Sequence, residues 1–134
     1  MQLRGIHHIG VAVADLDEAL STYQELFGGR LEARETMPSQ GAEAAAMLVG
    51  DSRVELLAAT GDDTPVGRFL ARRGPGMHHV AYEVRDIAAE LSRLDDEGVE
   101  LVDHEPRQGL YGLQVAFLHP SAVHGVLTEL VSRG

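Results

Sequence analysis

The chain contains one segment twice. Residues 7–20, HHIGVAVADLDEAL, align without a gap with residues 78–91, HHVAYEVRDIAAEL. The identical positions in the first copy are His7, His8, Val13, Asp15 and Leu20. So many matches at one offset indicate an internal duplication, and the fold is expected to consist of two similar halves.

Each copy predicts a strand followed by a helix. Residues 8–13 are rich in β-branched side chains and alternate bulky with small, which is typical of a half-buried strand. Asp15 follows in the position of a helix N-cap, because its carboxylate can accept from the open amides of a first turn. Apolar residues then recur at helical spacing up to Gly28-Gly29, a left-handed stop. The second copy repeats this pattern between Asp86 and Gly98.

Segments that favour strands follow each helix and are separated by turn residues. In the first half they cover about residues 30–36, 42–49 and 53–59, and in the second about 99–103, 113–118 and 125–131. Both halves therefore indicate a βαβββ module, at about residues 4–60 and 75–134, joined by a linker helix within about 61–74. We predict an α+β fold in one domain over residues 1–134, with two βαβββ modules in tandem forming a cupped mixed sheet around a metal site.

Composition limits the functions that this fold could perform. The chain has 134 residues, which is the size of one domain. Its net charge is −10 and its basic residues, all Arg, are scattered, so we expect no nucleic acid partner. The sequence has no apolar run of about 18 residues and no basic, apolar leader, so we expect a cytoplasmic protein without a membrane partner. It has no cysteine, so any metal must be held by nitrogen and oxygen ligands.

The doubled histidines are the first candidate ligands. Successive side chains of a strand point to opposite faces, so only one histidine of each pair can face the open side of the sheet. His8 shares its face with Gly10 and Ala12, whereas His7 lies on the bulky apolar face that packs under the helix. A single strand histidine is more often structural, but recurrence at the same repeat position favours His8 and His79 as a functional pair.

The last strand of each half supplies a carboxylate between apolar residues, at Glu55 and at Glu129. A charge in such surroundings costs several kcal/mol unless it is paired or bound to a metal, although either glutamate alone could instead face water from an edge strand. Together with the two histidines they form a set that suits a divalent ion such as Co²⁺, Ni²⁺, Mn²⁺, Fe²⁺ or Zn²⁺. Four protein ligands on an octahedral ion leave two positions for a chelating substrate.

These features resemble the vicinal oxygen chelate superfamily, through the paired modules, the HHIGVAV and HHVAYEV starts and the ELL and ELV ends. That superfamily includes glyoxalase I, extradiol dioxygenases, fosfomycin-modifying enzymes, bleomycin-binding proteins and methylmalonyl-CoA epimerases. Within it the chain is most similar to the epimerases, over the segments VELL, DTPVGRFL, GMHHVA, EPRQG, FLHP and GVLTELV.

The resemblance implies an isomerase that interconverts the 2R and 2S forms of methylmalonyl-CoA through an enolate. It implies a divalent metal, with Co²⁺ as the first choice, bound by His8, Glu55, His79 and Glu129. It also implies Glu129 as one catalytic base and points to Glu43, after a Gln-Gly pair, as the second. The spacing from Glu43 to the next Met-Leu is one residue longer than the family pattern, and a solvated surface glutamate is the alternative. An acyl-CoA substrate and a homodimer are the partners that it leads us to expect.

Three other functions remain open on the same fold. A glyoxalase-type isomerase would use similar ligands on a glutathione-like hemithioacetal. An extradiol dioxygenase would need Fe²⁺ on two histidines and one carboxylate, so a fourth ligand would be superfluous. A non-enzymatic protein of the bleomycin-binding kind would lack the ligand set, so the presence of all four residues argues against it.

Overall fold

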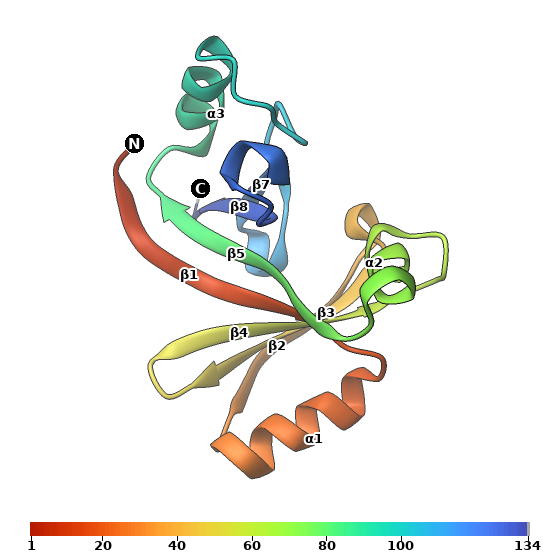
Figure 1. Cartoon of the computed structure of the whole chain (residues 1–134). Helices are drawn as coiled ribbons and strands as arrows, with labels where there is room; N and C mark the ends of the chain where they lie inside the picture. The colour runs from red at the N-terminus through yellow and green to blue at the C-terminus, as the bar shows by residue number, and fades with distance from the viewer. Residues whose placement is uncertain (134) are drawn as a thin grey trace. The chain divides into compact units, whose positions relative to one another are not determined.

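The computed structural model describes residues 1–133, which form an eight-stranded sheet and three α-helices (Figure 1). In chain order the elements are β1 (Leu3–Ala12), α1 (Leu16–Phe27), β2 (Arg30–Met37), β3 (Ala42–Val49), β4 (Ser52–Ala59), α2 (Pro65–Arg73), β5 (Gly76–Val84), α3 (Ile87–Asp96), β6 (Arg107–Gln108), β7 (Gln114–Leu118) and β8 (Thr128–Ser132). Short 3₁₀ turns lie at Pro38–Gln40, Leu110–Gly112 and Pro120–Val123. The α+β class and the two βαβββ modules predicted from the repeat are confirmed.

The sheet is mixed, with the strand order β2-β3-β4-β1-β5-β8-β7-β6. In each module the first strand pairs in parallel with the last, β1 with β4 and β5 with β8, while the later strands of the module pair antiparallel. By its contacts the chain divides into two compact units. We call residues 8–78 the N-terminal unit, and residues 1–7 together with the chain from His79 onward the C-terminal unit.

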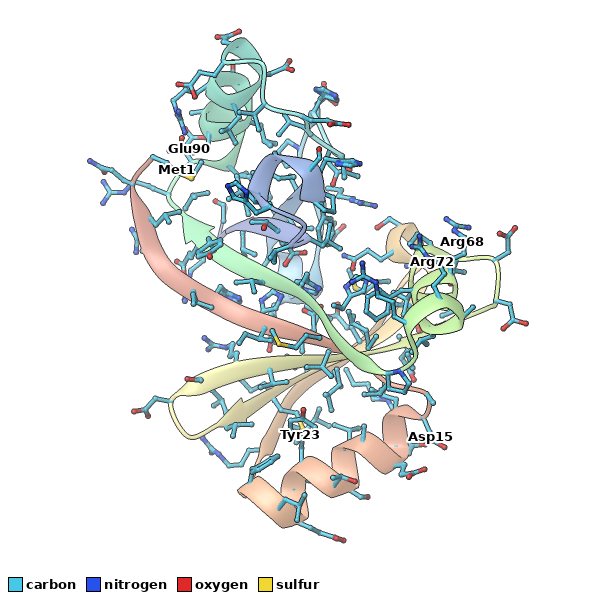
Figure 2. The ribbon with its side chains drawn as sticks, in the orientation of Figure 1. Met1, Asp15, Tyr23, Arg68, Arg72 and Glu90 are labelled. Carbon is cyan, nitrogen blue, oxygen red and sulfur yellow. The ribbon has the colours of Figure 1, made fainter. Side chains whose placement is uncertain are left out.

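In the N-terminal unit, α1 covers one face of the strands. Leu16 and Leu20 of the helix pack against Ala45, Met47 and Leu56 of β3 and β4. Figure 2 shows Asp15 at the start of this helix, and its carboxylate accepts from the backbone N–H of Glu18 at 3.0 Å. Asp15 is therefore the N-cap that its position in the repeat predicts.

The C-terminal unit repeats this packing with α3. Ile87, Leu91 and Leu94 pack against core side chains of β7 and β8, which are Ala116, Leu118 and Leu130. Asp86 caps α3 by accepting from the backbone N–H of Ala89 at 3.1 Å. The larger apolar cluster of each module thus lies under its helix.

One predicted strand, at about residues 99–103, is wrong. This segment makes only an isolated bridge, Leu101 to Leu118, and the second strand of the module is the short β6 instead. Leu101 is buried in the α3 core, so its apolar side chain packs rather than extending a strand. Asp103 accepts the backbone N–H of Phe117 at 2.9 Å with its side chain, where a strand would have used a carbonyl.

None of the helices in residues 1–133 combines the length and the apolar character needed to span a lipid bilayer.

Candidate metal and catalytic site

The N-terminal unit brings His8 and Glu55 together. Glu55 on β4 lies opposite Gly10 of β1, two residues beyond His8. Val11 and Leu56 pack toward α1, so strand alternation places His8 and Glu55 on the other face. His8 Nε2 and Glu55 Oε2 are 3.6 Å apart, and both residues are buried. Two of the four candidate ligands, His8 and Glu55, therefore lie together within this unit.

Burial keeps the His8 imidazole neutral. It lowers the pKa of His8 below its ordinary value, against the attraction of Glu55, and Arg53 lowers it further. A neutral imidazole has a lone pair that can bind a cation.

The C-terminal unit brings His79 and Glu129 together in the same way. Glu129 on β8 lies opposite Ala81 of β5, and His79 Nε2 and Glu129 Oε1 are 3.7 Å apart. Ala81 occupies the repeat position of Gly10, so both modules use one strand register to place their histidine and glutamate. His79 and Glu129 are each only 2% exposed.

Apolar and aromatic side chains surround this second pair. Ala81, Val115 and Val131 form a small buried cluster on the same face of the strands. The ring of Phe117 meets the His79 ring edge to face, with the ring centres 5.6 Å apart. These neighbours make the surroundings of Glu129 poor in water and low in dielectric constant.

These surroundings shift the pKa of Glu129. Burial raises the pKa of Glu129 to about 8, although the positive charge of Arg107 opposes the rise; Asp103 adds to it. Arg107 is itself paired with Asp103, with Nη2 and Oδ2 3.1 Å apart, and its guanidinium lies over the Phe117 ring. This raised pKa favours the protonated, neutral form of Glu129 near pH 7.

The other histidine of each doubled pair does not belong to these pairs. Strand alternation turns His7 away from the face of His8, and likewise turns His78 away from the face of His79. The His78 ring packs edge to face on Phe69 of α2, with the centres 4.9 Å apart, and burial lowers the pKa of His78. His78 is thus a packed aromatic side chain on the other face of β5.

Glu43 is not brought together with His8 and Glu55. On β3 it shares a strand face with Ala45 and Met47, which pack toward α1, so it lies on the face opposite that of Glu55. Arg34 bridges its carboxylate to α1, with Nη2 3.0 Å from Glu43 Oε1 and Nη1 2.6 Å from Asp17 Oδ1. A role of Glu43 as second base remains a prediction of the sequence resemblance.

Sequence reasoning missed Asp103 as a neighbour of the site and left Arg107 without a defined place. Arg107 belongs to the EPRQG segment, which carried a signal of resemblance, whereas Asp103 lies in the segment for which a strand was expected. The contact between Asp103 and Phe117 joins residues that are far apart along the chain, and no local pattern reveals it.

Comparisons with known proteins agree with this architecture. The sequence profile of the glyoxalase/bleomycin resistance protein/dioxygenase superfamily matches residues 7–117. An ethylmalonyl-CoA/methylmalonyl-CoA epimerase of Cereibacter sphaeroides is 34% identical over 127 residues, 93% of this chain and 95% of that protein. The mitochondrial methylmalonyl-CoA epimerase of Mus musculus is 35% identical over 130 residues, 96% of this chain and 73% of that protein.

A solved structure shows the same fold with a ligand bound. A methylmalonyl-CoA epimerase in complex with methylmalonyl-CoA and ammonium is 38% identical and superposes with a TM-score of 0.94, over 98% of this chain and 95% of that one.

Proposed function

Because the chain belongs to the glyoxalase/bleomycin resistance protein/dioxygenase superfamily, we propose that it is a methylmalonyl-CoA epimerase, an isomerase that inverts the C2 centre of methylmalonyl-CoA. The observation that carries this proposal is the buried His79–Glu129 pair, set in a chain that resembles epimerases over nearly its whole length. The substrate class is accordingly an acyl-CoA whose α-carbon lies between a thioester and a carboxylate.

We propose further that His8, Glu55, His79 and Glu129 hold one divalent cation. The donor set fits such an ion, because two imidazoles and two carboxylates are the nitrogen and oxygen ligands that Co²⁺, Mn²⁺, Ni²⁺, Fe²⁺ and Zn²⁺ accept. All four residues are buried, and each of His8, His79 and Glu129 offers one ligand atom. Following the family resemblance we propose Co²⁺ as the resident ion. When bound, a divalent cation supplies Lewis-acid stabilisation of negative charge on the substrate oxygens.

Glu129 is the proposed base. Its carboxylate lies beside His79 and away from bulk water, where it can accept a proton from carbon. The C2–H bond breaks, the proton passes to the Glu129 carboxylate, and the electron pair moves into the thioester carbonyl to give an enolate. The apolar cluster of Ala81, Val115 and Val131 excludes water from this face.

Inversion is complete when an acid returns a proton to the opposite face of C2. Glu43, which lies on the α1 face of β3, is the residue that the resemblance offers for this second group. We also propose a cytoplasmic homodimer, on the family resemblance alone; light scattering coupled to size-exclusion chromatography tests the dimer.

Isotope exchange tests the proposed activity. Protein loaded with Co²⁺ is incubated with 2S-methylmalonyl-CoA in D₂O, and mass spectrometry follows deuterium at C2 while chiral analysis follows the 2R product. We expect both to appear with the parent protein and to be lost in Glu129→Gln, whereas Asp95→Asn, a change on the exposed surface of α3, should retain them. Intact substrate without deuterium after long incubation with the parent protein would refute the epimerase assignment.

A further inference from the structure

Phe117 connects the His79–Glu129 pair to two residues outside it. Its ring lies edge to face with the His79 ring, 5.6 Å between centres, and its backbone lies opposite Glu129 in the antiparallel pairing of β7 with β8. Phe117 therefore touches both members of the pair, one through its side chain and one through its strand. A shift of Phe117 would therefore alter the packing against the His79 imidazole.

Asp103 holds the backbone of Phe117 on the side away from β8. Its Oδ2 accepts the backbone N–H of Phe117 at 2.9 Å. The carbonyl of Phe117 accepts from the backbone amides of Val102 and Asp103, at 3.0 and 3.1 Å. Both backbone polar groups of Phe117 are thus bound to residues 102–103, where the sequence led us to expect a regular strand.

Asp103 also holds the side chain of Phe117, through Arg107. The same Oδ2 accepts from Arg107 Nε at 3.2 Å and lies 3.1 Å from Arg107 Nη2. The guanidinium so fixed lies over the Phe117 ring, with its central carbon 5.5 Å from the ring centre. The Asp103 side chain is 17% exposed and that of Arg107 29%, so solvent screens this pair less than an ordinary surface ion pair.

We infer that Asp103 and Arg107 are positioning residues, which orient the His79 imidazole through Phe117. One carboxylate oxygen fixes the main chain of Phe117 and, through the guanidinium, its ring; the ring in turn fixes the plane of His79. Groups that orient a metal-binding histidine from behind tune metal affinity, and their substitution typically costs about 10- to 100-fold, because a misaligned lone pair binds poorly. This inference rests on the proposed role of His79 as a metal ligand.

The test measures Co²⁺ binding rather than turnover. Titration of metal-free protein with Co²⁺, followed by the visible absorption of the ion, gives the affinity and a spectrum that is sensitive to ligand geometry. We expect Asp103→Asn to weaken Co²⁺ binding about 10- to 100-fold and to alter the spectrum at saturation. Asn retains the shape and can still accept the Phe117 N–H, but it carries no charge to hold Arg107.

Two further variants separate positioning from folding. Phe117→Leu removes the ring between Arg107 and His79 and should change affinity and spectrum in the same direction as Asp103→Asn. The double variant Asp103→Asn/Phe117→Leu should bind Co²⁺ only slightly more weakly than either single variant, because both changes act through one contact. Asp95→Asn removes an aspartate that is exposed and pairs with His104 at 3.3 Å instead of Arg107, and it should leave Co²⁺ binding unchanged.

The outcomes distinguish the two proposals. If the parent protein does not bind Co²⁺, Mn²⁺ or Zn²⁺, the proposed metal function fails. If the parent binds and Asp103→Asn binds with the same affinity and spectrum, or if the effects of Asp103→Asn and Phe117→Leu add, only the positioning role is overturned. Should Asp103→Asn not fold, Arg107→Gln replaces it, since that change leaves the carboxylate bond to the Phe117 N–H in place.

Discussion

His79 and Glu129 lie on neighbouring parallel strands with Nε2 and Oε1 3.7 Å apart, and each is only 2% exposed. A carboxylate so deeply buried must share its charge with a proton or a cation, because an isolated charge in an apolar interior is costly. Without a metal ion the carboxyl group binds a proton, since burial raises the pKa of Glu129 to about 8. A metal ion would replace that proton, and this exchange can be measured.

Metal binding should therefore release a proton from Glu129. Below pH 8 the metal-free carboxyl is protonated and must ionise before it can bind, so the affinity for Co²⁺ should rise about tenfold per pH unit between pH 6 and 8. His8 adds little to this dependence because burial lowers its pKa. Calorimetric titrations in two buffers of different ionisation enthalpy give the number of protons released.

Glu129→Gln is the control for this titration, because its amide has no proton to lose. Any binding that the variant retains should release correspondingly fewer protons at pH 7. Equal proton release by parent and variant would show that Glu129 is already ionised in the metal-free protein.

The raised pKa of Glu129 should also appear in the pH dependence of the stability of the metal-free protein. Glu129 has a folded-state pKa near 8 and an ordinary value of 4.5, so its contribution to stability is fully present below pH 4.5 and is lost as the pH rises to 8. The loss approaches about 1.4 kcal/mol per pH unit within that window. Glu129→Gln should thus gain stability relative to the parent from pH 5 to pH 8 and no further above pH 8.

Urea unfolding of both metal-free proteins at several pH values measures this difference. Burial lowers the pKa of His8 and of His78, which makes stability rise with pH up to about their ordinary value of 6.5. Both proteins contain these histidines, so their contribution cancels in the comparison. A stability difference that is constant with pH would contradict the raised pKa.

The two glutamates named from the family resemblance should differ sharply in the exchange assay. Loss of a general base costs about 10² to 10⁴ in rate, and we expect a loss of that size in Glu129→Gln. Glu43 faces α1 and is paired with Arg34, so Glu43→Gln should lose less than about tenfold. It should also change unfolding free energy by no more than about 1 kcal/mol, as exposed ion pairs do. A loss above a hundredfold in Glu43→Gln would instead support Glu43 as the second base.

The repeat predicted most of the fold because its information is local. Asp15 and Asp86 cap helices by bonds that reach only three residues along the chain, and strand alternation separates His8 from His7 without any knowledge of the rest of the molecule. Because the pattern occurs twice, the interpretation of each copy could be checked against the other. The shared register of Gly10 with Glu55 and of Ala81 with Glu129 follows from that duplication.

The sequence did not predict what depends on contacts between distant segments. Residues 99–103 are apolar enough for a strand, but Leu101 is drawn into the α3 core and Asp103 binds a backbone N–H of β7. The face on which Glu43 lies depends on the register of β3, and a spacing difference of one residue is enough to reverse it. The family pattern thus identified Glu43 as a candidate, but only the strand pairing showed on which face of β3 it lies.

The doubled histidines offer a matched pair for testing the ligand assignment. His78 and His79 are adjacent on β5, but His79 lies by Glu129 whereas His78 packs on Phe69. An ion that binds only the folded protein stabilises it by about 2.7 kcal/mol at a concentration of 100 times Kd. Thermal unfolding with and without Co²⁺ should therefore show a large rise in Tm for the parent and for His78→Ala, and little or none for His79→Ala. His78→Ala should still unfold at a lower temperature than the parent, because it loses its contact with Phe69. An equal Co²⁺-dependent rise in His79→Ala would remove His79 from the ligand set.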